Sequence, residues 1–226
     1  MRLVFVRHGS PDYKNDCLTE EGHIQARQAA KRLEGEGITR VYSSSCGRAY
    51  ETAQYTAAAL GLEVIKLDFM REIQWGSIDG TPIFANGQPW KVTDKAIREG
   101  VDFFNKAEED RIWTGSKISI NKVMIGEALD EWLETLGYKR EGQFYRVVGD
   151  NTDTSVALFS HGGSSTAALA HLLNLPFAYL CTRLCPDLTA VTILSFGNEK
   201  GELVWPYIEL ANDARHIKSN GISYGQ

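Results

Sequence analysis

Two apolar runs that end in the same kind of residues constrain the fold of this chain most strongly. Residues 3–6 are followed by Arg7-His8-Gly9, and residues 156–159 are followed by Ser160-His161-Gly162. Neither run alternates with polar residues, which is typical of strands buried on both faces of a parallel sheet. Ligands of open α/β sheets bind at the carboxyl ends of the strands. If the two strands are neighbours, His8 and His161 lie side by side in one crevice.

The rest of the chain alternates between strand and helix patterns. The first part predicts strand, helix, strand, helix, strand at residues 2–7, 19–33, 39–43, 49–60 and 62–67. This order favours a parallel sheet with right-handed crossovers.

The second part predicts further regular elements. Helices are expected at residues 121–137 and 163–173, and strands at 155–160, 190–196 and 202–209, with a short strand or extended loop at 141–147. The glycine-bearing turn 197–201 indicates a hairpin, so one strand is antiparallel. We expect a three-layer α/β sandwich, in which a mostly parallel central sheet with one antiparallel strand carries helices on both faces.

One segment interrupts this regularity. The 226 residues, 43% of them apolar, suffice for a sizeable core, and we expect a single domain over residues 1–226. Residues 82–125 read as an insertion that is partly helical from about Thr93 to Lys106. The insertion either covers the site as a lid or forms a separate group of packed helices.

Charge and cysteine content exclude several classes of protein. The net charge of −5 argues against a nucleic-acid-binding surface, and no apolar stretch reaches the ~18 residues of a membrane span. We therefore expect a cytoplasmic protein without nucleic-acid or membrane partners. Cys181 and Cys185 lack a third and fourth metal ligand, so buried thiols are expected there and no metal or cofactor.

Four side chains at the predicted strand ends point to phosphate chemistry. Arg7 and Arg48 offer guanidinium forks that match phosphate oxygens. His8 and His161 add ring nitrogens, and the glycines beside them allow a ligand to approach the backbone closely. Helices that begin after these loops direct N–H groups at the same anion.

These residues, taken in order along the chain, resemble the histidine phosphatase superfamily, also called the phosphoglycerate mutase-like family. The resemblance rests on motifs over residues 7–163: Arg7-His8-Gly9, Leu18-Thr19-Glu20-Glu21-Gly22, the segment 43–52 with Arg48, Glu72 ahead of Gly76, and Ser160-His161-Gly162. The resemblance implies the phosphoglycerate mutase-like fold, a small-molecule phosphate ester as partner, and a monomer or homodimer.

The resemblance also implies a role for each residue. His8 attacks phosphorus and forms a phosphohistidine, while its other ring nitrogen is held by a backbone carbonyl. Arg7, Arg48 and His161 neutralise the transferred oxygens, so no metal is needed. Glu72 protonates the leaving oxygen and later deprotonates water.

The first loop departs from the family pattern. Relatives often carry Glu or Gln after the Arg-His-Gly, whereas Ser10 stands there in this chain. Asn15 lies one position later than the phosphate-binding Asn of relatives. Ser10, Asn15 and Gly162 are the remaining predicted phosphate contacts.

Three functions are compatible with these residues. The insertion carries scattered lysines and arginines but no compact basic cluster that would hold an acceptor carboxylate, which favours a histidine acid phosphatase-type hydrolase of a small phosphomonoester. The alternative enzyme is a cofactor-dependent phosphoglycerate mutase. A module that binds a phosphate ligand without turnover is the third possibility.

Overall fold

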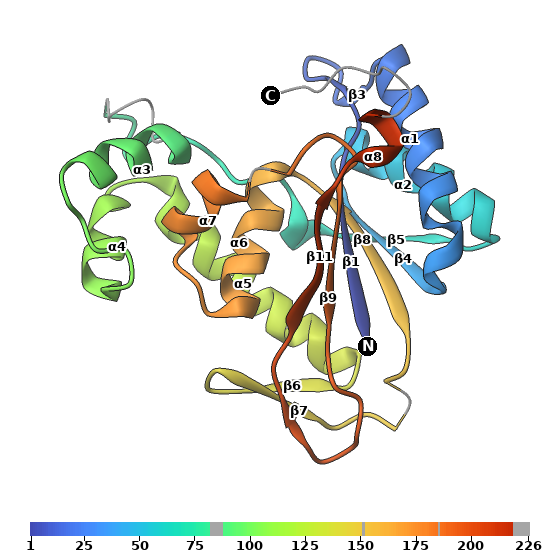
Figure 1. The fold of residues 1–226 in the computed structure, drawn as a ribbon. Coiled ribbons are helices and arrows are strands. Elements are labelled where there is room, and N and C mark those ends of the chain that lie inside the picture. The colour runs from blue at the N-terminus through green and yellow to red at the C-terminus, as the bar shows by residue number, and fades with distance from the viewer. Residues whose placement is uncertain (82–87, 151, 185, 219–226) are drawn as a thin grey trace.

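The computed structural model of the protein describes residues 1–81, 88–150, 152–184 and 186–218. Its centre is a six-stranded sheet, seen in Figure 1. The strands lie side by side in the order β11 (Tyr207–Asp213), β9 (Val191–Ser195), β1 (Arg2–Arg7), β8 (Ser155–Ser160), β4 (Ile38–Ser44) and β5 (Val64–Leu67). Pairs β1–β8, β8–β4 and β4–β5 are parallel, and β9 runs antiparallel to both of its neighbours. The predicted sheet, mostly parallel with one antiparallel strand, is confirmed.

Helices cover both faces of this sheet (Figure 1). One face carries α1 (Glu20–Leu33) and α2 (Gly47–Leu60), with α8 (Arg215–Lys218) against α1. The other face carries α5 (Lys117–Thr135), α6 (Gly162–Leu173) and α7 (Phe177–Arg183). The α/β sandwich with helices on both faces is therefore also confirmed.

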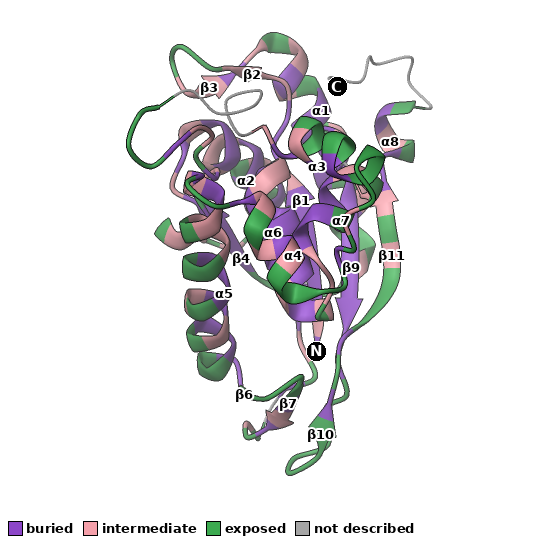
Figure 2. Cartoon of the chain, turned by 90° about the vertical axis from the view of Figure 1, so that its left-hand side faces the viewer, coloured by how far each residue is buried: buried purple, intermediate pink, exposed green. Residues whose placement is uncertain are grey.

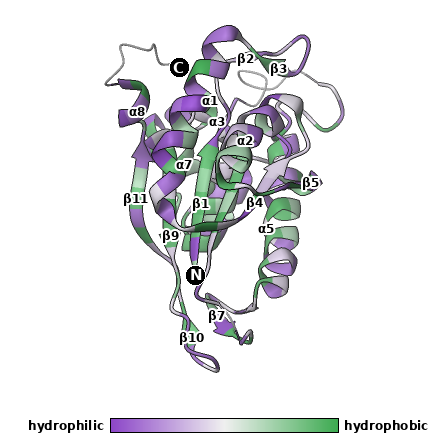
Figure 3. Ribbon diagram, turned by 90° about the vertical axis from the view of Figure 1, so that its right-hand side faces the viewer, coloured by the Kyte–Doolittle hydropathy of each residue, from purple (hydrophilic) through white to green (hydrophobic). Residues whose placement is uncertain are grey.

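Strand β1 shows why the sequence selects this architecture. Leu3 and Phe5 pack into the core on the α5–α7 side, whereas Val4 and Val6 pack into the core on the α1–α2 side. Each buried side chain of this kind stabilises the fold by about 1.5–3 kcal/mol. The central strands are accordingly buried in Figure 2 and apolar in Figure 3.

The insertion region differs from its prediction. The part expected to be helical, from about Thr93 to Lys106, has other bounds in the structure: α3 (Pro89–Arg98) covers its first half, residues 99–105 are not helical, and α4 (Lys106–Ile112) begins where helix was expected to end. Gly100, with φ +77°, turns the chain after α3. Asn105 caps α4 by accepting a hydrogen bond from the Ala107 N–H. Residues 82–87 of the predicted insertion lie outside the described residues.

The C-terminal strands also differ from their prediction. The expected strand 202–209 is split into β10 (Leu203–Val204) and β11, because Pro206 between them has no N–H for a ladder. β10 pairs with β7 (Phe144–Val147), and β7 pairs with β6 (Tyr138–Glu141), in a small separate sheet. The remaining short elements are β2 (Pro11–Asp12), β3 (Cys17–Leu18), η1 (Glu34–Glu36) and η2 (Asp68–Met70).

Close backbone packing positions the first loop over α1. Thr19 caps α1 by accepting the Gly22 N–H, as predicted. A Cβ added at Gly22 would lie 2.2 Å from the Ser10 carbonyl oxygen, and one at Gly9 would lie 2.7 Å from the Gly22 oxygen. Only glycine allows this approach, so the loop that carries His8 and Ser10 is fixed by contact with the first turn of α1.

We predict that Gly22→Ala destabilises the protein. The clash should lower the free energy of unfolding by about 1–3 kcal/mol, although alanine is the better helix former. Gly35→Ala is the matched control, because a Cβ there meets no atom within 4 Å. Urea titrations of both variants measure this, and equal midpoints for the two would contradict the packing argument.

Candidate active site

The pairing of β1 with β8 brings the two predicted histidines together. Arg7 lies opposite Ser160 in the parallel register, and the His8 N–H donates to the Ser160 carbonyl at 2.9 Å. The rings of His8 and His161 are 5.1 Å apart between centroids and meet edge to face at 62°. Both residues are buried, with 1% and 0% of their surface exposed. The crevice expected at the strand ends therefore contains both rings.

Hydrogen bonds fix the ring of His8. Its Nδ1 lies 2.7 Å from the Gly9 carbonyl oxygen, and because a carbonyl only accepts, Nδ1 carries the proton. Nε2 is then unprotonated and accepts from Nε of Arg48 at 3.3 Å. Burial lowers the pKa of His8 to about 3, and the Arg7 and Arg48 guanidiniums beside the ring act in the same direction. The hydrogen bond with the Gly9 carbonyl raises the pKa, but by less than burial lowers it. His8 thus presents a neutral ring with an available lone pair.

Arg48, in the first turn of α2, is held from both sides. Its Nη1 donates to Oδ1 of Asp16 at 2.5 Å, while Asp16 Oδ2 accepts the Gly47 N–H at 2.8 Å. Burial alone would raise the pKa of Asp16, but these contacts together keep it below its usual value. Thr52 donates to the Arg48 carbonyl and accepts the Gly9 N–H. This network ties α2 to the His8 loop.

Asp16 was not predicted from the sequence. An acidic residue in a polar loop carries no signal of its own, and its contact with Arg48 depends on the fold of residues 9–18.

Arg7 and His161 each carry a buried nitrogen that has no hydrogen-bond partner among the described residues. Arg7 Nη1 donates to the Pro186 carbonyl at 2.6 Å, while its Nε has no hydrogen-bond partner among the described residues. His161 precedes α6, with Nε2 2.9 Å from the Ser44 hydroxyl, and its Nδ1 likewise has no partner in the described chain. Burial, with His8 and the arginines nearby, lowers the pKa of His161. A Cβ at Gly162 would lie only 3.7 Å from Arg7 Nε, which places that backbone beside the guanidinium.

Glu72 lies against the N-terminus of α6. Its Oε1 accepts the N–H groups of Ile73 at 2.9 Å and Ser164 at 3.0 Å, and Oε2 accepts that of Gly163 at 3.3 Å. Burial raises the pKa of Glu72, against the opposing effect of these N–H groups and of Arg7. The carboxylate therefore shares the α6 N-terminus with the histidine site.

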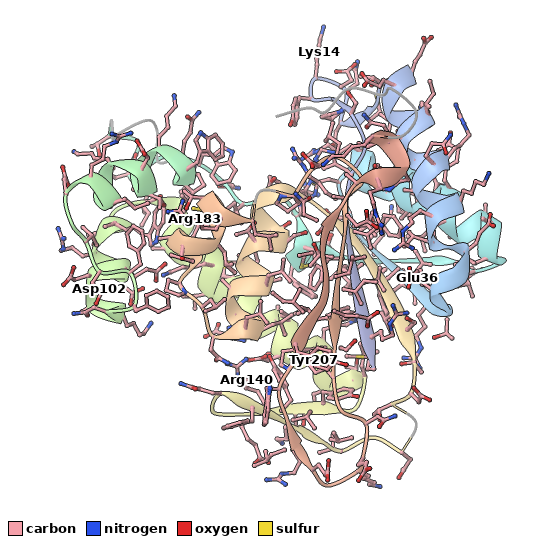
Figure 4. The ribbon with its side chains drawn as sticks, in the orientation of Figure 1. Lys14, Glu36, Asp102, Arg140, Arg183 and Tyr207 are labelled. Atoms are coloured by element: carbon pink, nitrogen blue, oxygen red, sulfur yellow. The ribbon has the colours of Figure 1, made fainter. Side chains whose placement is uncertain are left out.

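The structure does not bring Asn15 to the histidines. Asn15 is exposed, and its amide donates to Asp12 at 2.7 Å within the loop. Its neighbour Lys14 points away from the molecule in Figure 4. Ser10 is half-buried, with its N–H donating to Gln25 at 2.7 Å and its carbonyl accepting from Thr19.

A cavity of about 790 Å³ opens beside these residues. Its described lining includes Arg7, Glu72 and Gly162, together with side chains from α3 and α7. The site therefore adjoins a space large enough for a small metabolite.

No metal-binding arrangement or membrane-spanning helix is found in the described parts of the chain. Cys181 is buried, with its thiol 3.3 Å from the Thr93 hydroxyl. Cys185 lies outside the described residues.

A family model described as the histidine phosphatase superfamily (branch 1) matches residues 3–208. The probable phosphoglycerate mutase GpmB of Serratia proteamaculans is 35% identical over 193 residues, which cover 81% of this chain and 80% of that protein.

Solved structures share the fold. A mycobacterial glucosyl-3-phosphoglycerate phosphatase, in complex with inorganic phosphate, is 26% identical with a TM-score of 0.60, over 95% of this chain and 98% of that one. The phosphoserine phosphatase of Entamoeba histolytica, in complex with 3-phosphoglyceric acid, is 22% identical with a TM-score of 0.64, over 96% and 98% of the two chains.

We predict that His8 makes the protein sensitive to acid. A histidine with a depressed folded pKa contributes stability that is complete above its unfolded value of about 6.5 and is lost as the pH falls toward the folded value. Between pH 7 and pH 4 the wild type should lose roughly 3 kcal/mol more unfolding free energy than His8→Asn. Urea titrations at each pH test this, and parallel pH profiles for the two proteins would contradict a neutral buried His8.

Proposed function

The chain belongs to the histidine phosphatase superfamily (branch 1), and on that premise we propose that it is a metal-independent phosphomonoesterase of a small phosphorylated metabolite. The observation that carries the proposal is the geometry of His8. Its Nδ1 is held by the Gly9 carbonyl, and its unprotonated Nε2 lies 3.3 Å from Nε of Arg48. A neutral, oriented ring nitrogen beside a cation is what attack on a phosphate ester requires.

In the first step, Nε2 of His8 attacks phosphorus. The N–P bond forms and the ester O–P bond breaks, and the leaving oxygen takes a proton from Glu72. Arg7, Arg48 and His161 stabilise the charge on the transferred oxygens. The raised pKa of Glu72 supports its role as the acid.

In the second step, water attacks the phosphohistidine. The water gives a proton to Glu72, the N–P bond breaks, and the electron pair returns to Nε2 as phosphate is released. Glu72 thereby regains the proton that it donated. Positive charge comes from Arg7 and Arg48, so neither step requires a metal.

The mutase remains the second candidate, because the relative that is 35% identical is named a probable phosphoglycerate mutase. A mutase passes the phosphoryl group to a second acceptor that carries its own carboxylate. Three of the basic residues of α3 and α4 form ion pairs within their own helices: Lys95 with Glu99 at 3.7 Å, Arg98 with Asp94 at 3.0 Å and Lys106 with Asp110 at 3.2 Å. We therefore favour water as the acceptor.

We predict that the protein releases phosphate from a generic aryl phosphate in the presence of EDTA, and that His8→Asn loses this activity. Wild type denatured under alkaline conditions, in which the N–P bond of phosphohistidine is stable, should carry labelled phosphohistidine after incubation with a labelled ester. Transfer to 3-phosphoglycerate, primed by a bisphosphate and without free phosphate, would instead establish the mutase. Absence of both turnover and labelling would favour the binding module.

We predict that Glu72→Gln slows the two steps differently. For an alkyl ester the loss of the acid should reduce turnover by about 10²–10⁴-fold. For 4-nitrophenyl phosphate, whose leaving group needs no proton, the first step should persist and phosphohistidine should accumulate as a burst. Glu134→Gln, on the exposed surface of α5, is the control. Equal losses for both esters, without a burst, would contradict the acid–base role.

A further inference from the structure

The cavity beside His8 is lined mainly by apolar and aromatic side chains. Beyond the residues of the phosphate site, its described lining contains Tyr13, Trp75, Pro89, Trp90, Phe177 and Cys181. The segment after η2 and helices α3 and α7 supply most of these side chains. The part of the cavity that faces away from the phosphate site is therefore an apolar, aromatic surface.

Three of these aromatic rings present surface that the protein itself does not cover. Trp75 and Trp90 meet edge to face, with centroids 5.8 Å apart at 74°. Trp90 is 44% exposed and Tyr13 is 70% exposed, and the Arg48 guanidinium lies 5.5 Å from the Tyr13 ring centroid. Exposed aromatic faces around a cavity favour a flat apolar ligand. Stacked or edge-to-face rings contribute more binding free energy than the burial of their apolar area alone would give.

The charges of the cavity disfavour a second anionic group on the ligand. Among its described lining residues Arg7 is the one cation, and it faces the phosphate site, whereas Glu72 and Asp187 are acidic. Lys95 and Arg98, two exposed cations of α3, pair with acids of the same helix, Lys95 with Glu99 at 3.7 Å and Arg98 with Asp94 at 3.0 Å. Asp187 pairs with Lys218 at 3.6 Å, so the described lining offers a carboxylate on the leaving group no cation besides Arg7.

We propose that the substrate is a phosphomonoester whose leaving group is uncharged and carries an aromatic or similarly flat apolar ring. The ring occupies the part of the cavity that Tyr13, Trp75, Trp90 and Phe177 line. This inference rests on the proposed phosphatase function and specifies its substrate class. It separates the protein from enzymes that act on acidic glycerate or serine esters.

Esters with similar leaving-group basicity test the proposal. We expect kcat/KM for 2-phenylethyl phosphate to exceed that for 3-phosphoglycerate and for ethyl phosphate by about 100-fold, within the range that a well-fitted apolar contact gives. Trp90→Ala should lower kcat/KM for 2-phenylethyl phosphate about tenfold more than it lowers kcat/KM for ethyl phosphate. Trp205→Ala is the matched control, because Trp205 is 62% exposed and packs against Phe144 in the small sheet, outside the cavity.

The outcomes separate this inference from the proposed function. Comparable or faster hydrolysis of 3-phosphoglycerate, or equal losses for both esters in Trp90→Ala, would overturn the aromatic subsite and leave the phosphatase intact. If no ester is hydrolysed and His8 is not labelled, binding of 2-phenylethylphosphonate and ethylphosphonate is compared by calorimetry. Tighter binding of the aromatic phosphonate, weakened by Trp90→Ala, would support the subsite without the chemistry, and equal affinities would overturn it.

Discussion

The parallel pairing of β1 with β8 is the interaction on which the site depends. Because both strands are buried on both faces, their register is fixed by packing, and Arg7 lies opposite Ser160. The next residue of each strand is a histidine, so the rings lie 5.1 Å apart. A shift of the β1 register by one residue would turn every side chain of β1 toward the core on the opposite face of the sheet. The position of the proposed nucleophile is thus set by the hydrophobic core and not by a flexible loop.

Burial at this position determines the chemistry as well as the geometry. In water a histidine is partly protonated near neutral pH, but burial beside Arg7 and Arg48 lowers the pKa of His8. The environment that disfavours a protonated His8 also favours an anion bound beside it, because the nearby charges are the guanidiniums of Arg7 and Arg48. Asp16 partly balances the charge of Arg48 through their ion pair.

Sequence patterns predicted the sheet and the closeness of the two histidines because both depend on local signals. Apolar runs without polar alternation identified β1 and β8, and the residues directly after them identified the two histidines. The insertion was harder, because Gly100 and Asn105 divide it at positions where helical periodicity alone shows no break. Asp16 and the contacts of Glu72 with α6 were not predictable, since each joins segments that are brought together only by tertiary folding. Asn15 was expected at the phosphate by analogy with relatives, but in this shorter loop its amide pairs with Asp12.

Two opposing influences act on Glu72, and together they suit a group that must give and take a proton. The N–H groups at the start of α6 favour the carboxylate, as any helix N-terminus favours an anion. Burial favours the neutral acid and is the larger influence. A phosphate dianion bound beside Arg7 would add a negative charge next to the carboxylate and raise the pKa of Glu72 further. Departure of the leaving alcohol requires a protonated acid, and hydrolysis of the phosphohistidine requires the base that this donation produces. In the proposed mechanism, the helix that carries Gly162 and follows His161 therefore couples the phosphate site to the protonation of Glu72.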